Sequence, residues 1–312
     1  MNLLSKPVNQ KAGYLALCIT CIVWGTTWVV SKIGVNYLPP FQMAAMRQGI
    51  AGVLLVLFFA GYRRMPLPGF RQFVRIAGMA LLMFVGANGL STWSLKFIPT
   101  GLSSLIGALY PLTVVVAERL FFGSRSMNLL TFTGMMLGIG GVAIVFYENI
   151  FHHPGPGFFF GVGLSLAAML SWSIGTIVIA RRKSTVDPYH AIGWQMLLSA
   201  VVLGIISAVR ENPLPVATIP LKGWLSVLYL VIAGSLISFA AFIYSMKTLP
   251  AALFSLYAYI NPLVAMLTGA LLLGEKLTPY IFWGSVVTLA GVFLVNYSVR
   301  NQEPALNDKS GR

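Results

Sequence analysis

The chain has 312 residues, of which 57% are hydrophobic and only 9% are charged. Because soluble domains carry about 25% charged residues, this composition excludes a water-soluble globular protein and indicates one embedded in the lipid bilayer. The net charge of +14 would suit nucleic acid, but the basic residues lie in loops and at chain ends, so we expect no nucleic-acid partner.

A hydrocarbon core about 30 Å thick needs roughly 20 apolar residues per helix, and such stretches follow one another along the whole chain. They predict an all-α integral membrane protein with ten transmembrane helices at residues 13–33, 40–60, 74–95, 100–121, 128–147, 158–180, 189–209, 223–245, 251–273 and 279–299. Two polar tails remain, 1–12 and 300–312. The first stretch is too long for a cleaved signal peptide, and it is followed by further stretches of the same kind.

The first stretch contains a C-x-x-C pair, Cys18 and Cys21. A redox or metal-binding pair is one interpretation. The chain holds no further cysteine, and its three histidines lie far along the sequence. Two small residues on one helix face therefore explain the pair better, and we expect no metal and no cofactor.

The second stretch contains Arg47, about 10 Å from the Pro40 end of its helix at 1.5 Å per residue. Its long side chain could reach the outer surface from this depth. It could instead face the interior of the helix bundle, where it would bind a substrate carboxylate or tether backbone carbonyl groups. Polar side chains in a membrane usually face such an interior.

The second half of the sequence repeats the first half. At an offset of 151 residues, identical pairs include Lys96/Lys247, Pro99/Pro250, Pro111/Pro262, Leu112/Leu263 and Gly123/Gly274. At an offset of 148 residues, Trp24 corresponds to Trp172 and Arg47 to Gln195. The sequence therefore predicts two five-helix units, 13–147 and 157–299, joined by the link HHPGPG.

An odd number of helices per unit makes the second unit run the other way through the bilayer. Such inverted repeats are typical of secondary transporters that bind substrate near the membrane midplane, although duplication could also build a mere scaffold. Five basic residues fall on the side opposite to the two termini: Lys32, Lys96, Arg210, Lys222 and Lys276. All the others except Arg47 fall on the side of the termini. This bias predicts cytoplasmic termini.

Polar and aromatic residues in the middle of the stretches are candidates to line a central site. The expected substrate-binding residues are Trp24, Arg47, Asn88, Trp93, Ser104, Tyr110, Trp172, Gln195, Ser238, Tyr244, Tyr257 and Asn261. Pro111 and Pro262 are expected helix breaks, because each proline leaves a carbonyl group unpaired four residues earlier, at Gly107 and Ala258. Paired interruptions of this kind point to a binding site, although each could be a packing kink.

Small residues predict close helix packing at Gly134, Gly138, Gly284 and Gly291. Whether these glycines pack helices within one chain or form the seam of a homodimer stays open.

Several segments resemble the EamA-type members of the drug/metabolite transporter superfamily: WGTTWVVSK (24–32), PPFQMAAMRQGIAGVLL (39–55), LKFIPTGLSSLIGALYPL (95–112), MKTLPAALFSLYAYINPL (246–263) and GEKLTPYIFWGSVVTLAGVFLV (274–295). The resemblance covers essentially the whole chain. It implies a ten-helix, two-repeat carrier in the cell (inner) membrane, often an exporter of amino acids or other small metabolites. One departure is Ser124, where the family usually has the glutamate seen at Glu275 in the second half.

The seven acidic residues all lie away from the middle of the stretches, whereas ion-driven carriers commonly place a carboxylate there. We therefore expect a facilitative exporter of a small organic metabolite such as an amino acid, working by alternating access. A proton-coupled drug or metabolite exporter, a non-transporting scaffold and a channel are the alternatives. An enzyme is not expected, because no nucleophile or metal cluster lies at depth.

Overall fold

The computed structural model describes residues 10–122, 128–151, 155–181, 186–254 and 256–309. These residues form helices and turns, without a β-strand among them. The α-helices are α1 (Gln10–Gly34), α2 (Pro40–Val56), α3 (Phe70–Met79), α4 (Leu90–Ser94), α5 (Thr100–Ala108), α6 (Tyr110–Phe122), α7 (Leu129–Phe151), α8 (Phe158–Arg181), α9 (Pro188–Arg210), α10 (Leu221–Tyr229), α11 (Ser238–Thr248), α12 (Ala251–Phe254), α13 (Tyr257–Leu273) and α14 (Pro279–Lys309).

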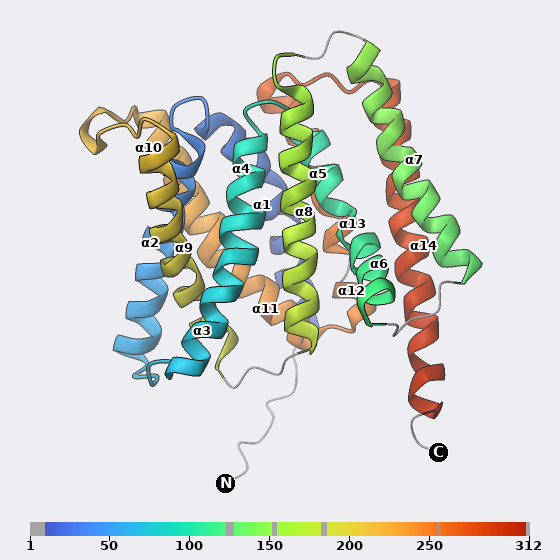
Figure 1. Ribbon diagram of the computed structural model, residues 1–312, viewed down its shortest axis with the longest axis horizontal. Coiled ribbons are helices and arrows are strands. Elements are labelled where there is room, and N and C mark those ends of the chain that lie inside the picture. Colours follow the sequence, from blue (N-terminus) through green and yellow to red (C-terminus); the bar gives the residue numbers. More distant parts are fainter. Residues whose placement is uncertain (1–9, 123–127, 152–154, 182–185, 255, 310–312) are drawn as a thin grey trace.

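Three π-helical segments, η1 (Leu57–Tyr62), η2 (Ala80–Gly89) and η4 (Leu230–Ile237), continue the α-helices beside them, and η3 (Val216–Thr218) is a short 3-10 turn. Counted together with these segments, nine helices within the described residues are long and apolar enough to cross a bilayer. A tenth apolar stretch is divided between α12, which has 4 residues, and α13, which has 17 residues and is shorter than these nine helices. The helices form one bundle, and both ends of the chain emerge from the same side of it (Figure 1).

The expected stretches agree with these helices, with differences at the ends. The helix α1 begins at Gln10 and α14 continues to Lys309, so helix extends into both of the expected polar tails. Residues 1–9 and 310–312 lie outside the described residues, as do Ser124 and the first part of the link, His152 to Pro154.

Prolines begin several helices, and a glycine ends one of them. Pro40, Pro188 and Pro279 occupy the first position of α2, α9 and α14, where a missing N–H group costs nothing because that group has no partner inside the helix. The helix α13 ends at Gly274, whose φ of 67° is the left-handed cap that glycine adopts without strain.

Helices that correspond in the two halves of the sequence pack against each other. The most extensive helix pairs are α7 with α14 and α2 with α9. In addition, α1 packs on α13 and α11, while α8 packs on η2, α4, α5 and α6. The elements of the second half that α1 contacts thus correspond in sequence to the elements of the first half that α8 contacts.

Glycines allow the closest of these contacts. A Cβ atom on Gly141 would lie 2.5 Å from the carbonyl oxygen of Gly284, and one on Gly134 would lie 2.8 Å from that of Gly291. The glycines that the sequence assigned to close packing therefore join α7 to α14 within one chain.

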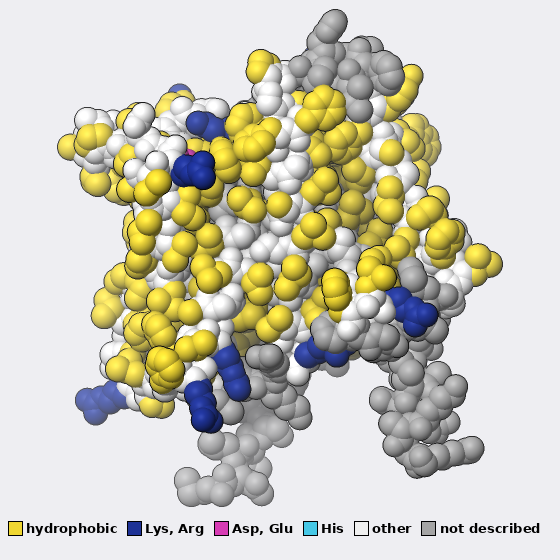
Figure 2. Space-filling view, viewed as in Figure 1, with side chains coloured by type: hydrophobic (Ala, Val, Ile, Leu, Met, Phe, Trp, Pro, Cys, Tyr) yellow, Lys and Arg dark blue, Asp and Glu magenta, His cyan; other side chains and the backbone are white. Residues whose placement is uncertain are grey.

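On the face of the bundle shown in Figure 2, apolar side chains cover the middle and basic side chains gather toward the two ends. Exposed residues such as Leu57, Leu120, Val209 and Leu271 lie on this apolar surface. Such a distribution suits a bundle whose solvent is hydrocarbon along its sides and water at its ends.

Candidate functional site

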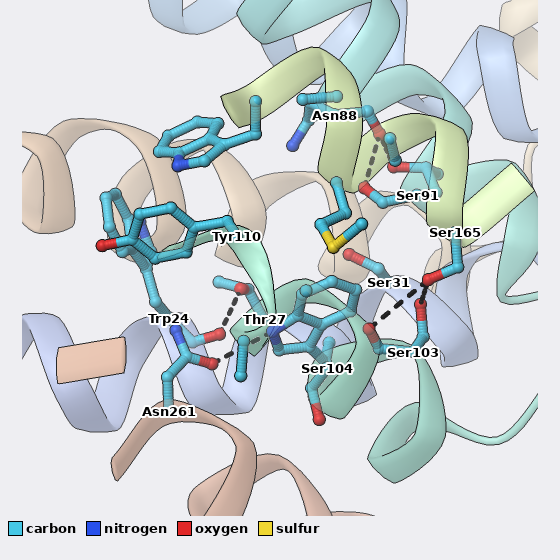
Figure 3. Close-up of a pocket in the computed structure, with 18 of the residues that line it drawn as sticks. Trp24, Thr27, Ser31, Asn88, Ser91, Ser103, Ser104, Tyr110, Ser165 and Asn261 are labelled. Carbon is cyan, nitrogen blue, oxygen red and sulfur yellow. Dashed lines mark hydrogen bonds between the residues drawn. The ribbon is translucent and has the colours of Figure 1, made fainter. Parts of the chain in front are cut away.

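A cavity of about 190 Å³ lies inside the bundle and is bordered by side chains from both halves of the chain. At about 30 Å³ per water molecule, this volume equals roughly six waters, which suits a small organic molecule. Ten of its lining residues are labelled in Figure 3, where hydroxyl, amide and aromatic groups converge from several helices. Its wall is formed by α1, α5, α8, α13, the segment from η2 to α4, and single residues of α2, α6 and α11.

One face of α1 supplies a continuous strip of the wall. Trp24, Thr27, Trp28 and Ser31 all line the cavity, and their spacing of three and four residues places them on the same side of an α-helix. The indole nitrogen of Trp28 donates to the side-chain oxygen of Asn261 at 3.0 Å, which ties α1 to α13.

The two tryptophans at corresponding positions of the halves meet in this wall. The ring centroids of Trp24 and Trp172 lie 6.5 Å apart, with the rings perpendicular. Phe239 and Phe242 of α11 also contact Trp24, at centroid distances of 5.2 Å and 4.9 Å. Such contacts place ring edges against ring faces, so this part of the site is apolar.

Arg47 is buried, with 6% of its surface exposed, and lines the cavity. Its Nε donates to the hydroxyl of Ser235 at 3.0 Å, and its Nη2 donates to the carbonyl oxygen of Gly234 at 3.3 Å. The same carbonyl oxygen accepts from the indole nitrogen of Trp24 at 3.2 Å. The guanidinium thus connects α2 to the π-helical segment η4 beside the cavity.

Hydroxyl groups gather in another part of the wall. The Ser103 hydroxyl lies 3.1 Å from that of Ser94 and 3.1 Å from that of Ser165, so α5 is joined to α4 and α8. Ser103 and Ser165 face the cavity (Figure 3). A hydroxyl both donates and accepts, so this cluster suits either a donor or an acceptor on a solute.

The buried amide of Gln48 lies behind Asn88. Gln48 is almost fully buried and donates to the Asn88 side-chain oxygen at 3.0 Å. This bond leaves the Asn88 amide nitrogen for the cavity that Asn88 lines. The Gln48 side-chain oxygen is the one buried side-chain polar atom of the described residues that lacks a hydrogen-bond partner.

Both proline-containing crossings border the cavity, but their interruptions differ. Between α5 and α6 the break falls at Leu109, directly before Tyr110 and Pro111. In the other crossing α12 ends at Phe254 and α13 begins at Tyr257, so Pro262 lies inside α13 rather than at the break. Gly107 and Ala258, whose carbonyl groups the prolines were expected to free, both line the cavity.

Tyrosines from the two interrupted crossings meet at the breaks. The Tyr257 hydroxyl donates to that of Tyr110 at 2.9 Å, and both residues line the cavity. Tyr257 also packs against Phe254, Phe242 and Trp24, at centroid distances between 5.2 Å and 5.9 Å. Aromatic side chains therefore gather around this part of the cavity wall.

The structure brings most of the expected site residues together. Those that line the cavity are Trp24, Arg47, Asn88, Ser104, Tyr110, Trp172, Tyr257, Asn261 and Pro262.

The other expected residues lie outside this wall. Trp93 packs between Phe41 and Phe160, and the Ser238 hydroxyl donates to the Ala233 carbonyl oxygen. Gln195 is half-buried away from the cavity, and Tyr244 is 37% exposed. Pro111 is buried beside the helix break and does not line the cavity.

Sequence reasoning missed several lining residues. Thr27, Trp28 and Ser31 follow Trp24 at helical spacing, so the helical period would have identified them. Ser165 gave no comparable signal. Ser235 is polar at mid-stretch, but its contact with Arg47 and that of Gly234 could not be predicted, because the two residues lie 188 and 187 positions from Arg47 in sequence.

The arrangement can bind a small solute that is both polar and apolar. The wall offers aromatic faces, hydroxyl and amide groups and one guanidinium, the only formally charged side chain among the described residues that line it. Among the described residues, His, Cys, Asp and Glu side chains do not gather in threes as a metal site requires. The site is therefore built for recognition through aromatic contact, hydrogen bonds and positive charge.

The EamA-like transporter family model matches the chain twice, at residues 11–147 and 159–297. The inner membrane transporter YedA of Escherichia coli K12 is 33% identical over 282 residues, which cover 90% of this chain and 89% of YedA. A chloroplastic WAT1-related protein of Arabidopsis thaliana is 30% identical, covering 89% of this chain and 68% of that protein. A probable amino-acid metabolite efflux pump of Salmonella typhimurium is 26% identical, covering 96% and 99%.

A solved crystal structure shares the fold, with a TM-score of 0.64, 18% sequence identity and coverage of 94% of this chain and 99% of the other. Together with the membrane-spanning helices of the described residues, the relationship to YedA identifies a multi-pass inner-membrane protein. The family model spans nearly the whole chain, and members of that family are transporters and not enzymes. The chain therefore belongs to the EamA-like transporter family.

Proposed function

We propose that this transporter is a facilitative exporter that carries a small organic metabolite, such as an amino acid, by alternating access. The observation that carries the proposal is the cavity shared by both halves, where the corresponding residues Trp24 and Trp172 meet. A carrier with one site between two related halves can expose that site to one side and then to the other.

The proposal includes two inverted five-helix repeats with both termini in the cytoplasm. The contacts of α1 with the second half resemble those of α8 with the first half, and α7 and α14 run in opposite directions in Figure 1. Two antiparallel copies of one unit can exchange conformations, and this exchange would open one side of the cavity as it closes the other.

Facilitative transport is favoured by the charge of the wall. Proton- and sodium-coupled carriers bind the coupling ion in the site, commonly at a carboxylate. Here a buried guanidinium borders the cavity, and its positive charge repels a cation at close range in a medium of low dielectric constant. An amino acid suits the wall, and the Salmonella relative is named as an amino-acid metabolite efflux pump.

The test is flux in proteoliposomes that contain the purified full-length chain. Vesicles are loaded with a radiolabelled mixture of the protein amino acids, and efflux is measured with and without an imposed pH gradient. We expect saturable efflux and counterflow that persist without the gradient. Efflux that stops when the gradient is dissipated would identify a proton-coupled exporter. Efflux without counterflow would identify a channel. Efflux equal to that of empty liposomes would contradict amino-acid transport.

A further inference from the structure

The charge of Arg47 has no matching negative charge in the described part of the cavity wall. Its guanidinium donates to two neutral groups of the described residues, the hydroxyl of Ser235 and the carbonyl oxygen of Gly234. The acidic side chains Glu211 and Glu275 instead bind backbone N–H groups at the first turns of α2 and α5. Because an ion buried at low dielectric is costly without a counter-charge, this site favours the arrival of an anion.

We propose that Arg47 binds an oxyanion of the transported solute, so that the cavity selects carboxylates or phosphates over analogues that lack the oxyanion. This inference rests on the proposed function, because it assigns the recognition group of that same cavity. Arginine carries five N–H donors in a planar fork that matches two oxygens of a carboxylate or phosphate. The bonds to Ser235 and Gly234 use two of the five, and the side chain borders the cavity.

Snorkelling does not explain this arginine. A snorkelling side chain carries its charge to the membrane surface, whereas Arg47 is 6% exposed and ends against η4 in the other half of the chain. The remaining alternative is a purely structural tie between α2 and η4. The two roles differ in their consequence, because a structural tie has no preference for the charge of the solute.

The rest of the wall complements an oxyanion held at Arg47. Trp24 contacts the same Gly234 carbonyl oxygen as the guanidinium, so an apolar surface adjoins the charge. Figure 3 shows the hydroxyls of Ser103 and Ser165 in a different part of the cavity from Trp24 and Tyr110. A solute with one anionic group, an apolar portion and a further polar group would use all three parts.

Binding at Arg47 also provides a link to conformational change. An oxyanion at the remaining N–H donors attracts the guanidinium more strongly than the neutral oxygens of Ser235 and Gly234 do, because it carries a full negative charge at close range in a medium of low dielectric constant. Ser235 and Gly234 lie in η4, a π-helical segment, and such segments are frequent at functional sites. Solute binding would thereby loosen the tie between α2 and η4.

The experiment uses the full-length chain in proteoliposomes loaded with a defined mixture. The mixture holds the protein amino acids, common dicarboxylates and phosphate monoesters, together with amino-acid amides that lack the carboxylate. Released solutes are quantified by mass spectrometry for the wild-type chain and for Arg47→Gln, Arg47→Lys and Ser235→Ala. The matched control is Arg75→Gln, an exposed arginine of α3, and circular dichroism and size-exclusion chromatography verify folding.

We expect the wild-type chain to export oxyanions in preference to their amides, and the control to do the same. Arg47→Gln should lower oxyanion export roughly 10- to 100-fold, the loss expected for hydrogen bonds to a charged group, with little change for amides. Oxyanion export by Arg47→Lys should lie between that of the wild type and that of Arg47→Gln, because lysine keeps the charge and loses the planar fork of N–H donors. Preference for dicarboxylates and amino acids over phosphate monoesters would assign the oxyanion as a carboxylate, and the reverse as a phosphate.

Equal export of acids and amides by the wild-type chain would overturn the inference and leave transport intact. An equal loss of both by Arg47→Gln would assign Arg47 to a structural tie and overturn it as well. If no solute is exported above the level of empty liposomes, the proposed function itself is contradicted. Should Arg47→Gln fail to fold, the acid-to-amide ratios of the wild type and Arg47→Lys still decide the question.

Discussion

Glu275 binds the first turn of α5 from a position 175 residues away in sequence. Its two carboxylate oxygens accept from the Thr100 N–H at 2.8 Å and from the Thr100 hydroxyl at 2.7 Å, and the Gly101 N–H lies 3.4 Å away. Negative charge at a helix N-terminus is stabilised by the helix dipole and by N–H groups that have no partner inside the helix. This carboxylate therefore ties the second half of the chain to the first.

We predict that Glu275→Gln destabilises the protein by about 1–2 kcal/mol, because it removes a charged helix cap. Thermal unfolding of the full-length chain in lipid nanodiscs measures the effect. Lys276→Gln is the matched control, since Lys276 is the exposed neighbour and its loss should leave Tm unchanged. Equal Tm values for the two variants would show that the cap contributes nothing to stability.

At the level of single residues, the sequence identified polar side chains at depth but not their partners. Arg47 and Asn261 were expected in the site and border the cavity. The contact of Arg47 with Ser235 and that of Asn261 with Trp28 join helices far apart in the chain. Such contacts depend on which helices become neighbours, and local periodicity holds no information about that choice.

At the level of elements, the contact between α7 and α14 depends on glycines. A Cβ atom on Gly141 would meet the backbone N of Thr288 and the carbonyl oxygen of Gly284. Backbone atoms cannot rotate aside as side-chain atoms can, so the two helices would have to separate. Gly140, the next residue along the helix, has nothing within 4 Å of a Cβ atom.

We predict that Gly141→Ala destabilises the protein by about 3 kcal/mol, the upper end of the usual cost of overpacking. Gly140→Ala should be neutral or slightly stabilising, because alanine is favoured over glycine in a helix by about 1 kcal/mol. Thermal unfolding of the two variants beside the wild type provides the measurement. A Tm for Gly141→Ala equal to that of Gly140→Ala would contradict the close contact between α7 and α14.

A π-helical segment precedes two expected site residues that lie outside the cavity wall. A π-helix bonds each N–H to the fifth residue back, so it holds more residues per turn than an α-helix. Side chains after η4 are therefore rotated away from the positions that a period of 3.6 residues predicts. Ser238 directly follows η4 and Tyr244 lies further along α11, and neither lines the cavity. Hydropathy alone does not distinguish the two kinds of helix.

At the level of the whole molecule, the apolar stretches located the helices, because a bilayer requires long segments whose backbone groups bond internally. The same rule explains what was missed. It sets the length of a crossing and does not require it to be one unbroken helix, so the break between α12 and α13 could not be located from length. The order of the crossings in space depends on contacts such as those between Gly134 and Gly291.

The orientation of the bundle is open to a direct test. Both chain ends emerge from one side (Figure 1), and most basic residues belong to that side by sequence, which the positive-inside rule assigns to the cytoplasm. Gly155 lies within the link between the halves, where the chain has made five crossings under the ten-helix arrangement, and it is exposed with nothing within 4 Å of a Cβ atom. It should therefore lie outside.

We predict opposite labelling of two single-cysteine variants, Gly155→Cys and Ser310→Cys, in a background where Cys18 and Cys21 are alanine. In right-side-out vesicles a membrane-impermeant maleimide should label Gly155→Cys and spare Ser310→Cys, and in inside-out vesicles the pattern should reverse. The cysteine-free parent is the control for background labelling. If both variants react from the same side, the second half makes an even number of crossings and cannot be the inverted counterpart of the first. If each reacts from the side opposite to the prediction, the termini are external and the basic residues do not set the orientation.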